Sequence, residues 1–135
     1  MSETPKLRGL ANVSYWADDW SAAKDWYSEL IGFEPYFLRD GYAEWRLGDD
    51  LDELGLVDNR YRPQSATGKG PSGVVLYWHV DDVHGMFERL LAMGATEHER
   101  PQDRGRGFVT ATVIDPFGNL LGVMYNPHYV EVKGQ

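Results

Sequence analysis

The sequence predicts an α+β fold composed of two βαβββ modules, and two internal similarities indicate the duplication. The segment Ala-Asp-Asp-Trp at residues 17–20 resembles Val-Asp-Asp-Val at residues 80–83, and each opens an amphipathic helical pattern. Residues 53–59 likewise resemble residues 120–126. A repeated unit decides the architecture before single residues are interpreted, so we expect one module to be present twice.

Each module combines four strands with one helix, which leaves one face of its sheet bare of helices. Pairing two such faces gives a curved mixed sheet around a central cleft. We therefore expect a single domain over residues 1–135, with module one at about residues 8–60, a linker at about 61–72 and module two at about 73–126.

Module one begins with a strand at residues 10–17 and a helix. Alternation along the strand gives two faces, Val13, Tyr15 and Ala17 on one and Asn12, Ser14 and Trp16 on the other. Asp18 or Asp19 caps the helix, which runs to about Ile31 and ends at Gly32. Strand patterns follow at residues 33–39, 42–47 and 54–57.

Module two repeats this order. A strand at residues 73–80 precedes a helix that is capped by Asp82 and runs to about Met93, with Gly94 as its stop signal. The next strand begins at residues 95–100, and residues 101–107 are expected to form a charged, glycine-rich loop. Two strands, at residues 108–114 and 120–125, complete the module, and residues 126–135 are expected to be a tail.

The segment Asp-Pro-Phe-Gly-Asn at residues 115–119 joins the last two strands. Proline presets φ at the second position of a turn, while glycine and asparagine tolerate positive φ. We therefore expect a tight reversal here.

The composition restricts the classes of function. The chain lacks cysteine, which excludes disulfides and thiolate metal sites and fits a reducing compartment. No apolar run approaches the roughly 20 residues of a membrane-spanning helix, so we expect a cytoplasmic protein without a membrane partner. The net charge of −8 argues against binding to nucleic acid and is compatible with a neutral or cationic small molecule.

These features together resemble the vicinal oxygen chelate superfamily, which includes glyoxalase I, extradiol dioxygenases and fosfomycin- and bleomycin-resistance proteins. The resemblance rests on the helix segment at residues 26–33, the segment at residues 80–83, Gly94 and the turn at residues 115–119. It extends from about residue 10 to residue 125. It implies the cleft architecture described above, a small-molecule ligand and a homodimer.

The resemblance also implies four positions for the ligands of a divalent cation, and none of them carries a suitable side chain. The positions are Asn12 and Val75 on the first strands and Gly55 and Gly122 on the last strands. Such a cation requires imidazole nitrogen or carboxylate oxygen. A shift of one residue would bring Glu53 or Leu54, and Leu120 or Leu121, to the site without restoring it. We therefore expect no metal and no other cofactor.

The same faces provide a candidate ligand site of aromatic and polar residues, the usual composition of a small-molecule pocket. The candidate ligand-binding residues are Asn12, Ser14, Trp16, Glu44, Arg46, Gly55, Tyr77, His79 and Gly122. Glycines at two equivalent positions are expected to leave room for a flat ligand. The alternative is that Trp16 belongs to the core and that the glycines only permit strand packing.

The remaining histidines are weaker candidates. His84 is expected to be solvated, and His128 is expected to have no role in the tail. His98 and Glu99 are placed at a strand end, where a metal pair is less expected than simple exposure.

Three functions remain open. The first is a binding protein that sequesters a small aromatic or cationic molecule in the cleft without a catalytic metal. The second is an enzyme of lyase, isomerase or dioxygenase type, either with a relocated metal held by His79 and Glu44 or with metal-free acid–base chemistry in which Glu44 acts as general base. The third is a domain that acts through protein contacts.

Overall fold

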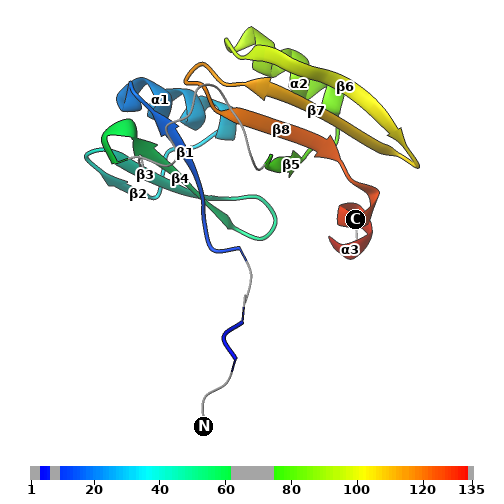
Figure 1. Cartoon of the computed structure of the whole chain (residues 1–135), viewed down its shortest axis with the longest axis horizontal. Coiled ribbons are helices and arrows are strands. Elements are labelled where there is room, and N and C mark those ends of the chain that lie inside the picture. The colour runs from blue at the N-terminus through cyan, green and yellow to red at the C-terminus, as the bar shows by residue number, and fades with distance from the viewer. Residues whose placement is uncertain (1–3, 7–9, 62–74, 134–135) are drawn as a thin grey trace. The chain divides into compact units, whose positions relative to one another are not determined.

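The computed structural model describes residues 4–6, 10–61 and 75–133 (Figure 1). The chain divides into two compact units, one ending at residue 62 and one beginning at residue 63, and each is described by itself. Each unit has the order β-α-β-β-β and one four-stranded mixed sheet. The predicted α+β fold of two βαβββ modules is therefore confirmed.

Unit one consists of β1 (Val13–Ala17), α1 (Trp20–Ile31), β2 (Phe37–Arg39), β3 (Tyr42–Leu47) and β4 (Asp52–Asp58), followed by a 3₁₀ turn at Asn59–Tyr61. The strand order is β1-β4-β3-β2, which we call sheet one. β1 runs parallel to β4, and the other neighbours are antiparallel.

The core of unit one lies between α1 and one face of sheet one. The buried side chains from the strands are Tyr15, Ala17, Ala43, Trp45, Leu54 and Leu56. From the helix, Ala23 and Tyr27 are buried, and the Tyr27 ring stacks on Tyr15 with centroids 5.4 Å apart. The Asp19 side chain caps α1 by accepting from the Ala22 N–H at 3.2 Å, and Gly32 ends it at φ 101°. Both predicted ends of this helix are confirmed.

Unit two consists of β5 (Tyr77–His79), α2 (Val83–Ala92), β6 (Thr96–Gly105), β7 (Phe108–Ile114), β8 (Leu120–Tyr125) and α3 (Pro127–Lys133). The strand order is β5-β8-β7-β6, which we call sheet two. β5 runs parallel to β8 as β1 does to β4. Val83, Phe87 and Leu90 of α2 are buried.

The turn between β7 and β8 is the predicted tight reversal. Asp115 is buried, and its Oδ1 accepts from the N–H groups of Phe117 at 2.9 Å and Asn119 at 2.8 Å. Its Oδ2 accepts from the Asn119 side chain at 3.0 Å, and Gly118 takes φ 92°. The side chain of Asp115 thus fixes the turn that sets the register of β8 against β7.

Two predictions in unit two are wrong. Residues 101–107 are not simply a loop, because β6 continues through Pro101 to Gly105. β6 is an edge strand with register shifts, and an edge accommodates proline where a ladder hydrogen bond is not needed. The tail at residues 126–135 contains α3, whose first turn is capped by Asn126 Oδ1, the acceptor of the His128 N–H at 2.9 Å.

Other boundaries are shorter than expected. The strand predicted at residues 33–39 forms only at Phe37–Arg39, because the chain first leaves the left-handed cap at Gly32 and passes Pro35. The predicted linker at residues 61–72 falls, apart from Tyr61, outside the described residues, as do the first two residues of the strand predicted at 73–80.

Candidate functional site

The face of sheet one opposite α1 carries a row of predicted site residues. Ser14 of β1 pairs with Gly55 of β4, and Gly55 pairs with Glu44 of β3, so the three cross the sheet side by side. In the next row Glu53 pairs with Arg46. Ser14 and Arg46 are exposed, while Glu44 and Glu53 are half-buried.

Five polar side chains on this face form what we call the sheet-one network, comprising Asn12, Ser14, Tyr42, Glu44 and Glu53. Asn12 Nδ2 donates to Glu53 Oε2 at 2.7 Å, and the Ser14 hydroxyl donates to Asn12 Oδ1 at 2.7 Å. The Tyr42 hydroxyl donates to Glu44 Oε1. Two short hydrogen-bonded chains thus bring a phenol, an amide, a hydroxyl and two carboxyls together.

Gly55 lies beneath the ring of Tyr42. A Cβ placed on Gly55 would be 3.2 Å from the Tyr42 ring and hydroxyl and 3.3 Å from Ser14 Oγ. The space that the missing side chain leaves is therefore occupied by Tyr42 rather than left vacant for a flat ligand. The glycine leaves room on β4 for the ring of Tyr42, whose hydroxyl reaches Glu44 two residues further along β3.

The carboxyl of Glu44 holds its proton more tightly than an ordinary glutamate. Burial raises its pKa, and the negative charge of Glu53 and a hydrogen bond between the two carboxyls raise it further, while the Arg46 guanidinium acts in the opposite direction. The pKa of Tyr42 is raised by burial and by Glu53, against a hydrogen bond with Asn12 that lowers it. The negative charge of Glu53 disfavours ionisation of Glu44.

Aromatic side chains border the network. Phe37 of β2 lies opposite Glu44, and its ring centroid is 6.1 Å from that of Tyr42. The Arg46 guanidinium lies 4.6 Å above the ring of Tyr36. Tyr36 and Phe37 are exposed. Trp16, two residues beyond Ser14 on β1, is half-buried and pairs with Val57.

Sheet two places a tyrosine over its own glycine. Tyr77 pairs with Gly122, which pairs with Thr112. A Cβ on Gly122 would be 2.7 Å from the backbone oxygen of Leu76 and 2.8 Å from the Tyr77 ring. Thr112 is buried, and its hydroxyl lies 2.8 Å from His98 Nδ1.

His79 is held by contacts within its own unit. The Asn126 N–H donates to His79 Nδ1 at 3.2 Å, and the ring of Tyr129 stacks on the imidazole with centroids 4.4 Å apart. Asp81 lies 3.6 Å from His79 Nε2. The predicted partner for a relocated metal, Glu44, belongs to the other unit.

The three weaker histidine candidates, His84, His98 and His128, are exposed, and His128 lies in a helix that the sequence did not predict there. His98 and Glu99 lie inside β6 rather than at a strand end, and Glu99 pairs with Arg104 at 2.7 Å. The ring of His128, assigned to a tail without a role, packs edge-on against Phe108 at 5.2 Å. His84 is exposed, as predicted.

Two members of the network, Tyr42 and Glu53, were not among the predicted site residues. A signal for both exists in the sequence. Tyr42 alternates with Glu44 and Arg46 on one strand, and Glu53 alternates with Gly55 on the next. Alternation alone does not indicate which face of a strand meets the helix.

The four positions implied for a divalent cation do not fit one. The Asn12 amide is engaged by Glu53 and Ser14, and Gly55 and Gly122 offer no donor atom. Over residues 4–6, 10–61 and 75–133, no cluster of three or more His, Asp or Glu side chains could hold a metal ion. That the inherited metal is lost stays a prediction. No helix in the same ranges is long and apolar enough to cross a membrane.

Comparisons with known proteins agree with the fold. A family model described as the Glyoxalase/Bleomycin resistance protein/Dioxygenase superfamily matches residues 9–123. A comparison with curated proteins gave no match.

Among solved structures, a glyoxalase-related enzyme from Fulvimarina pelagi is 21% identical with a TM-score of 0.73, over 90% of each chain. A lactoylglutathione lyase from Agrobacterium tumefaciens is 21% identical with a TM-score of 0.68, over 92% of this chain and 98% of that one. A glyoxalase/bleomycin resistance protein from Catenulispora acidiphila is 24% identical with a TM-score of 0.60, over 86% and 96%.

At these identities the structures share the fold, and the family model supplies the assignment. It spans both modules, including the repeated helix openings and the turn at residues 115–119 on which the resemblance to the vicinal oxygen chelate superfamily rests. The chain belongs to the glyoxalase/bleomycin resistance protein/dioxygenase superfamily.

Proposed function

We propose that the chain binds and sequesters a small organic cation with an aromatic portion on the face of sheet one that carries the network. The observation that supports this most directly is the Glu44–Glu53 carboxyl pair. The two carboxyls are half-buried on the same sheet face and interact with each other. A bound cation would offset the repulsion between Glu44 and Glu53 that raises the pKa of Glu44.

The charge balance of the face supports a cation rather than an anion. Arg46, the basic residue paired with Glu53 in register, directs its guanidinium over the Tyr36 ring. Two carboxyls and one guanidinium leave an excess of negative charge when both glutamates are ionised. A ligand of positive charge is therefore attracted to this face.

The aromatic border supports a flat or apolar portion on the ligand. Tyr36 and Phe37 are exposed beside the carboxyl pair, and Tyr42 covers Gly55 at its centre. Aromatic faces attract cations and stack with planar rings, each by about 0.5–2 kcal/mol. Ser14 and Asn12 add hydrogen-bonding groups at the other edge.

A pair of matched probes tests the proposal. Binding of 1-methylquinolinium and of its neutral counterpart 1-methyl-2-quinolone is measured by calorimetry on the full chain. We expect the cation to bind about tenfold tighter, the factor that corresponds to about 1.4 kcal/mol. Glu44→Gln combined with Glu53→Gln should abolish this preference, and Glu88→Gln on the exposed surface of α2 should leave it unchanged.

Equal affinity for the two probes, or a preference for the cation that survives in the double variant, would contradict the proposal. Trp16→Ala provides a further measurement. If Trp16 contributes a stacking wall, its loss weakens binding by about 1–3 kcal/mol. If it belongs to the core, binding stays the same and the melting temperature falls.

A second candidate function, metal-free acid–base catalysis, is favoured by the hydrogen bond between Tyr42 and Glu44. A carboxyl with a raised pKa is closer to the range in which a general base acts at neutral pH. Under this function Glu44→Gln would reduce turnover about 100-fold or more while retaining ligand. Mass spectrometry distinguishes sequestration from catalysis. A ligand that co-purifies with the chain keeps its mass after incubation with a sequestering protein, whereas an enzyme changes it.

A further inference from the structure

Arg46 lies at one end of the sheet-one network, and its charge is not compensated by direct contact with a carboxylate. The side chain is exposed, pairs in register with Glu53, and lies two residues from Glu44 on the same face of β3. Among residues 4–6, 10–61 and 75–133, however, no carboxylate forms an ion pair or hydrogen bond with it. The guanidinium carbon instead lies 4.6 Å from the centroid of the Tyr36 ring. A guanidinium has five N–H donors in a planar fork, so those of Arg46 are available to an anion.

The two carboxyls beside Arg46 are held by other groups. Glu53 accepts from Asn12 Nδ2 at 2.7 Å, and Glu44 accepts from the Tyr42 hydroxyl. Burial and Glu53 raise the pKa of Glu44, and the Arg46 guanidinium lowers it, so the guanidinium acts on this carboxyl without contacting it. Residues two apart on a strand are separated by about 7 Å. The face therefore presents negative and positive charge side by side, each held in place by a neutral group.

Aromatic surface connects the two charged ends. Phe37 of β2 lies opposite Glu44, and the ring of Tyr36 lies beneath the Arg46 guanidinium. The centroids of these two rings are 6.5 Å apart, and Phe37 is 41% and Tyr36 52% exposed. A planar ligand can therefore contact the rings while its two ends reach charges of opposite sign.

We propose that the cation bound on sheet one also carries a carboxylate and that Arg46 binds this carboxylate, so that the ligand is an aromatic zwitterion. Given the proposed function, on which this assignment rests, the cationic end lies at Glu44 and Glu53. The carboxylate accepts two parallel N–H···O bonds from the guanidinium, the geometry that arginine favours. A cation without a carboxylate would meet the like charge of Arg46 and leave its donors unused.

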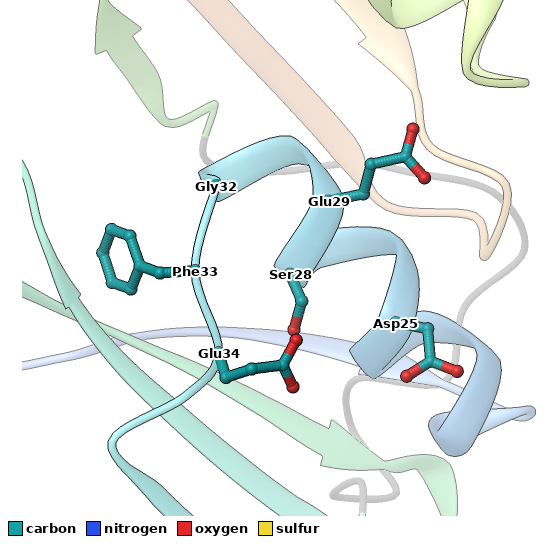
Figure 2. Close-up of a pocket in the computed structure, with 6 residues that line it drawn as sticks. All are labelled: Asp25, Ser28, Glu29, Gly32, Phe33 and Glu34. Atoms are coloured by element: carbon teal, nitrogen blue, oxygen red, sulfur yellow. The ribbon is translucent and has the colours of Figure 1, made fainter.

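A different acidic surface of unit one lacks this arrangement of charges. It is a pocket of about 560 Å³ at the C-terminal end of α1 (Figure 2). The lining residues are Asp25, Ser28, Glu29, Gly32, Phe33 and Glu34. Three of these side chains carry carboxylates and none is basic, so the pocket attracts a cation, but none of its lining side chains matches the carboxylate of a zwitterion. The amides of Gly32 and Phe33 therefore serve as an internal reference for attraction by negative charge alone.

The test compares 1-methylquinolinium-6-carboxylate with 1-methylquinolinium-6-carboxamide, a cation of nearly the same shape whose substituent is uncharged. Their binding to the full chain is measured by calorimetry at a mildly alkaline pH. We expect the carboxylate probe to bind about two- to fivefold tighter, the range of an exposed ion pair.

Arg46→Gln separates a binding role from a structural one. The carboxylate probe should bind more weakly to this variant, because Glu44 and Glu53 repel its anionic end. The carboxamide probe should bind more tightly, because a like charge has been removed, so the order of the two affinities reverses. Arg89→Gln, the same charge change on the exposed surface of α2, should leave both affinities unchanged. An equal loss of affinity for both probes in Arg46→Gln would assign Arg46 to the packing of the face and overturn the proposal.

Amide shifts in NMR spectra of the same complexes locate the probes. The carboxylate probe should shift the amides of Glu53 and Gly55 and leave those of Gly32 and Phe33 unchanged. Shifts by this probe at Gly32 and Phe33 alone would overturn the proposal. If the carboxamide probe bound at Gly55 and the carboxylate probe bound no tighter, the zwitterion would be excluded and the proposed function would stand. If neither probe bound, both would fail.

Discussion

The two sheets place different chemistry at equivalent positions of one backbone pattern. In sheet one the residue opposite the glycine of the last strand is Glu44, and in sheet two it is Thr112. Both glycines, Gly55 and Gly122, lie under a tyrosine ring. The two modules therefore share the glycine, but the covering tyrosine comes from β3 in sheet one and from β5 in sheet two. The residue on the neighbouring antiparallel strand that pairs with the glycine also differs.

The next row shows the same divergence. Glu53 pairs with Arg46 in sheet one, whereas Leu120 pairs with Ile114 in sheet two. A row that carries two opposite charges in one module is apolar in the other. The charged row of this face is therefore confined to module one, and under the proposed function only module one attracts the cation.

The largest difference that we expect between the modules concerns these glycines. Gly122→Ala should destabilise the chain by about 2 kcal/mol, because its Cβ would meet the Leu76 backbone oxygen at 2.7 Å. That oxygen also accepts the Gly122 N–H at 3.1 Å, so it cannot retreat without breaking the bond. Midpoints of urea unfolding measure the effect.

Gly55→Ala is the matched comparison. The three atoms nearest to its Cβ would all belong to side chains, at 3.2–3.3 Å. Alanine is favoured over glycine inside a strand by about 0.5–1 kcal/mol, so we expect a stability within about 1 kcal/mol of the wild type. Equal losses of stability in Gly55→Ala and Gly122→Ala would show that the two glycines are packed equally tightly and would contradict the expected difference between the modules.

The turns that precede the last strands also differ. Module two uses Gly118 at φ 92° next to the buried Asp115, whereas module one places Leu51 at φ 55° with 65% of its surface exposed. A left-handed conformation costs a non-glycine residue about 1–2 kcal/mol. We expect Leu51→Gly to stabilise the chain by about 0.5–1 kcal/mol once the entropy of glycine is subtracted, which thermal unfolding measures.

Gly48→Ala in the same turn is the control with the opposite sign. Gly48 takes φ 81°, and a Cβ there would meet no atom within 4 Å. Any loss of stability then comes from the backbone conformation alone. If Leu51→Gly destabilised the chain, the exposed leucine would have a packing role that the turn geometry does not indicate.

Features encoded by local chemistry were predictable from the sequence. Asp19 and Gly32 fixed the ends of α1, and the segment at residues 115–119 formed the expected turn. The alignment of Gly55 with Gly122 placed both at the same register position of their sheets. Each of these depends on neighbouring residues or on comparison of the two repeats, both of which a sequence contains.

Features that depend on tertiary packing were not predicted. Tyr42 reaches Glu44 because Gly55 on the adjacent strand leaves it space. That relation appears only when the register of β3 and β4 is known. α3 did leave a signal, since Asn126 before Pro127 is a helix cap followed by a favoured first residue, but so short a helix has little propensity of its own.

The smallest effect on stability concerns the proton of Glu44. Its pKa is raised in the folded chain, so the folded state binds this proton more readily than the unfolded state. Stability should therefore fall as pH rises from the ordinary pKa of a glutamate through the raised one, by less than about 1 kcal/mol for a solvent-screened group. Glu44→Gln should lose this component of the pH dependence, whereas Glu88→Gln should keep it.

Affinity for a cation should change in the opposite direction over the same pH range, because only the ionised carboxyl attracts it. Calorimetry of 1-methylquinolinium in buffers of different ionisation enthalpy would then record release of a proton on binding. If stability fell with pH but binding released no proton, Glu44 would not contact the ligand. If both were observed, the same carboxyl would govern stability and cation binding, a role that Thr112 at the equivalent position of module two cannot have.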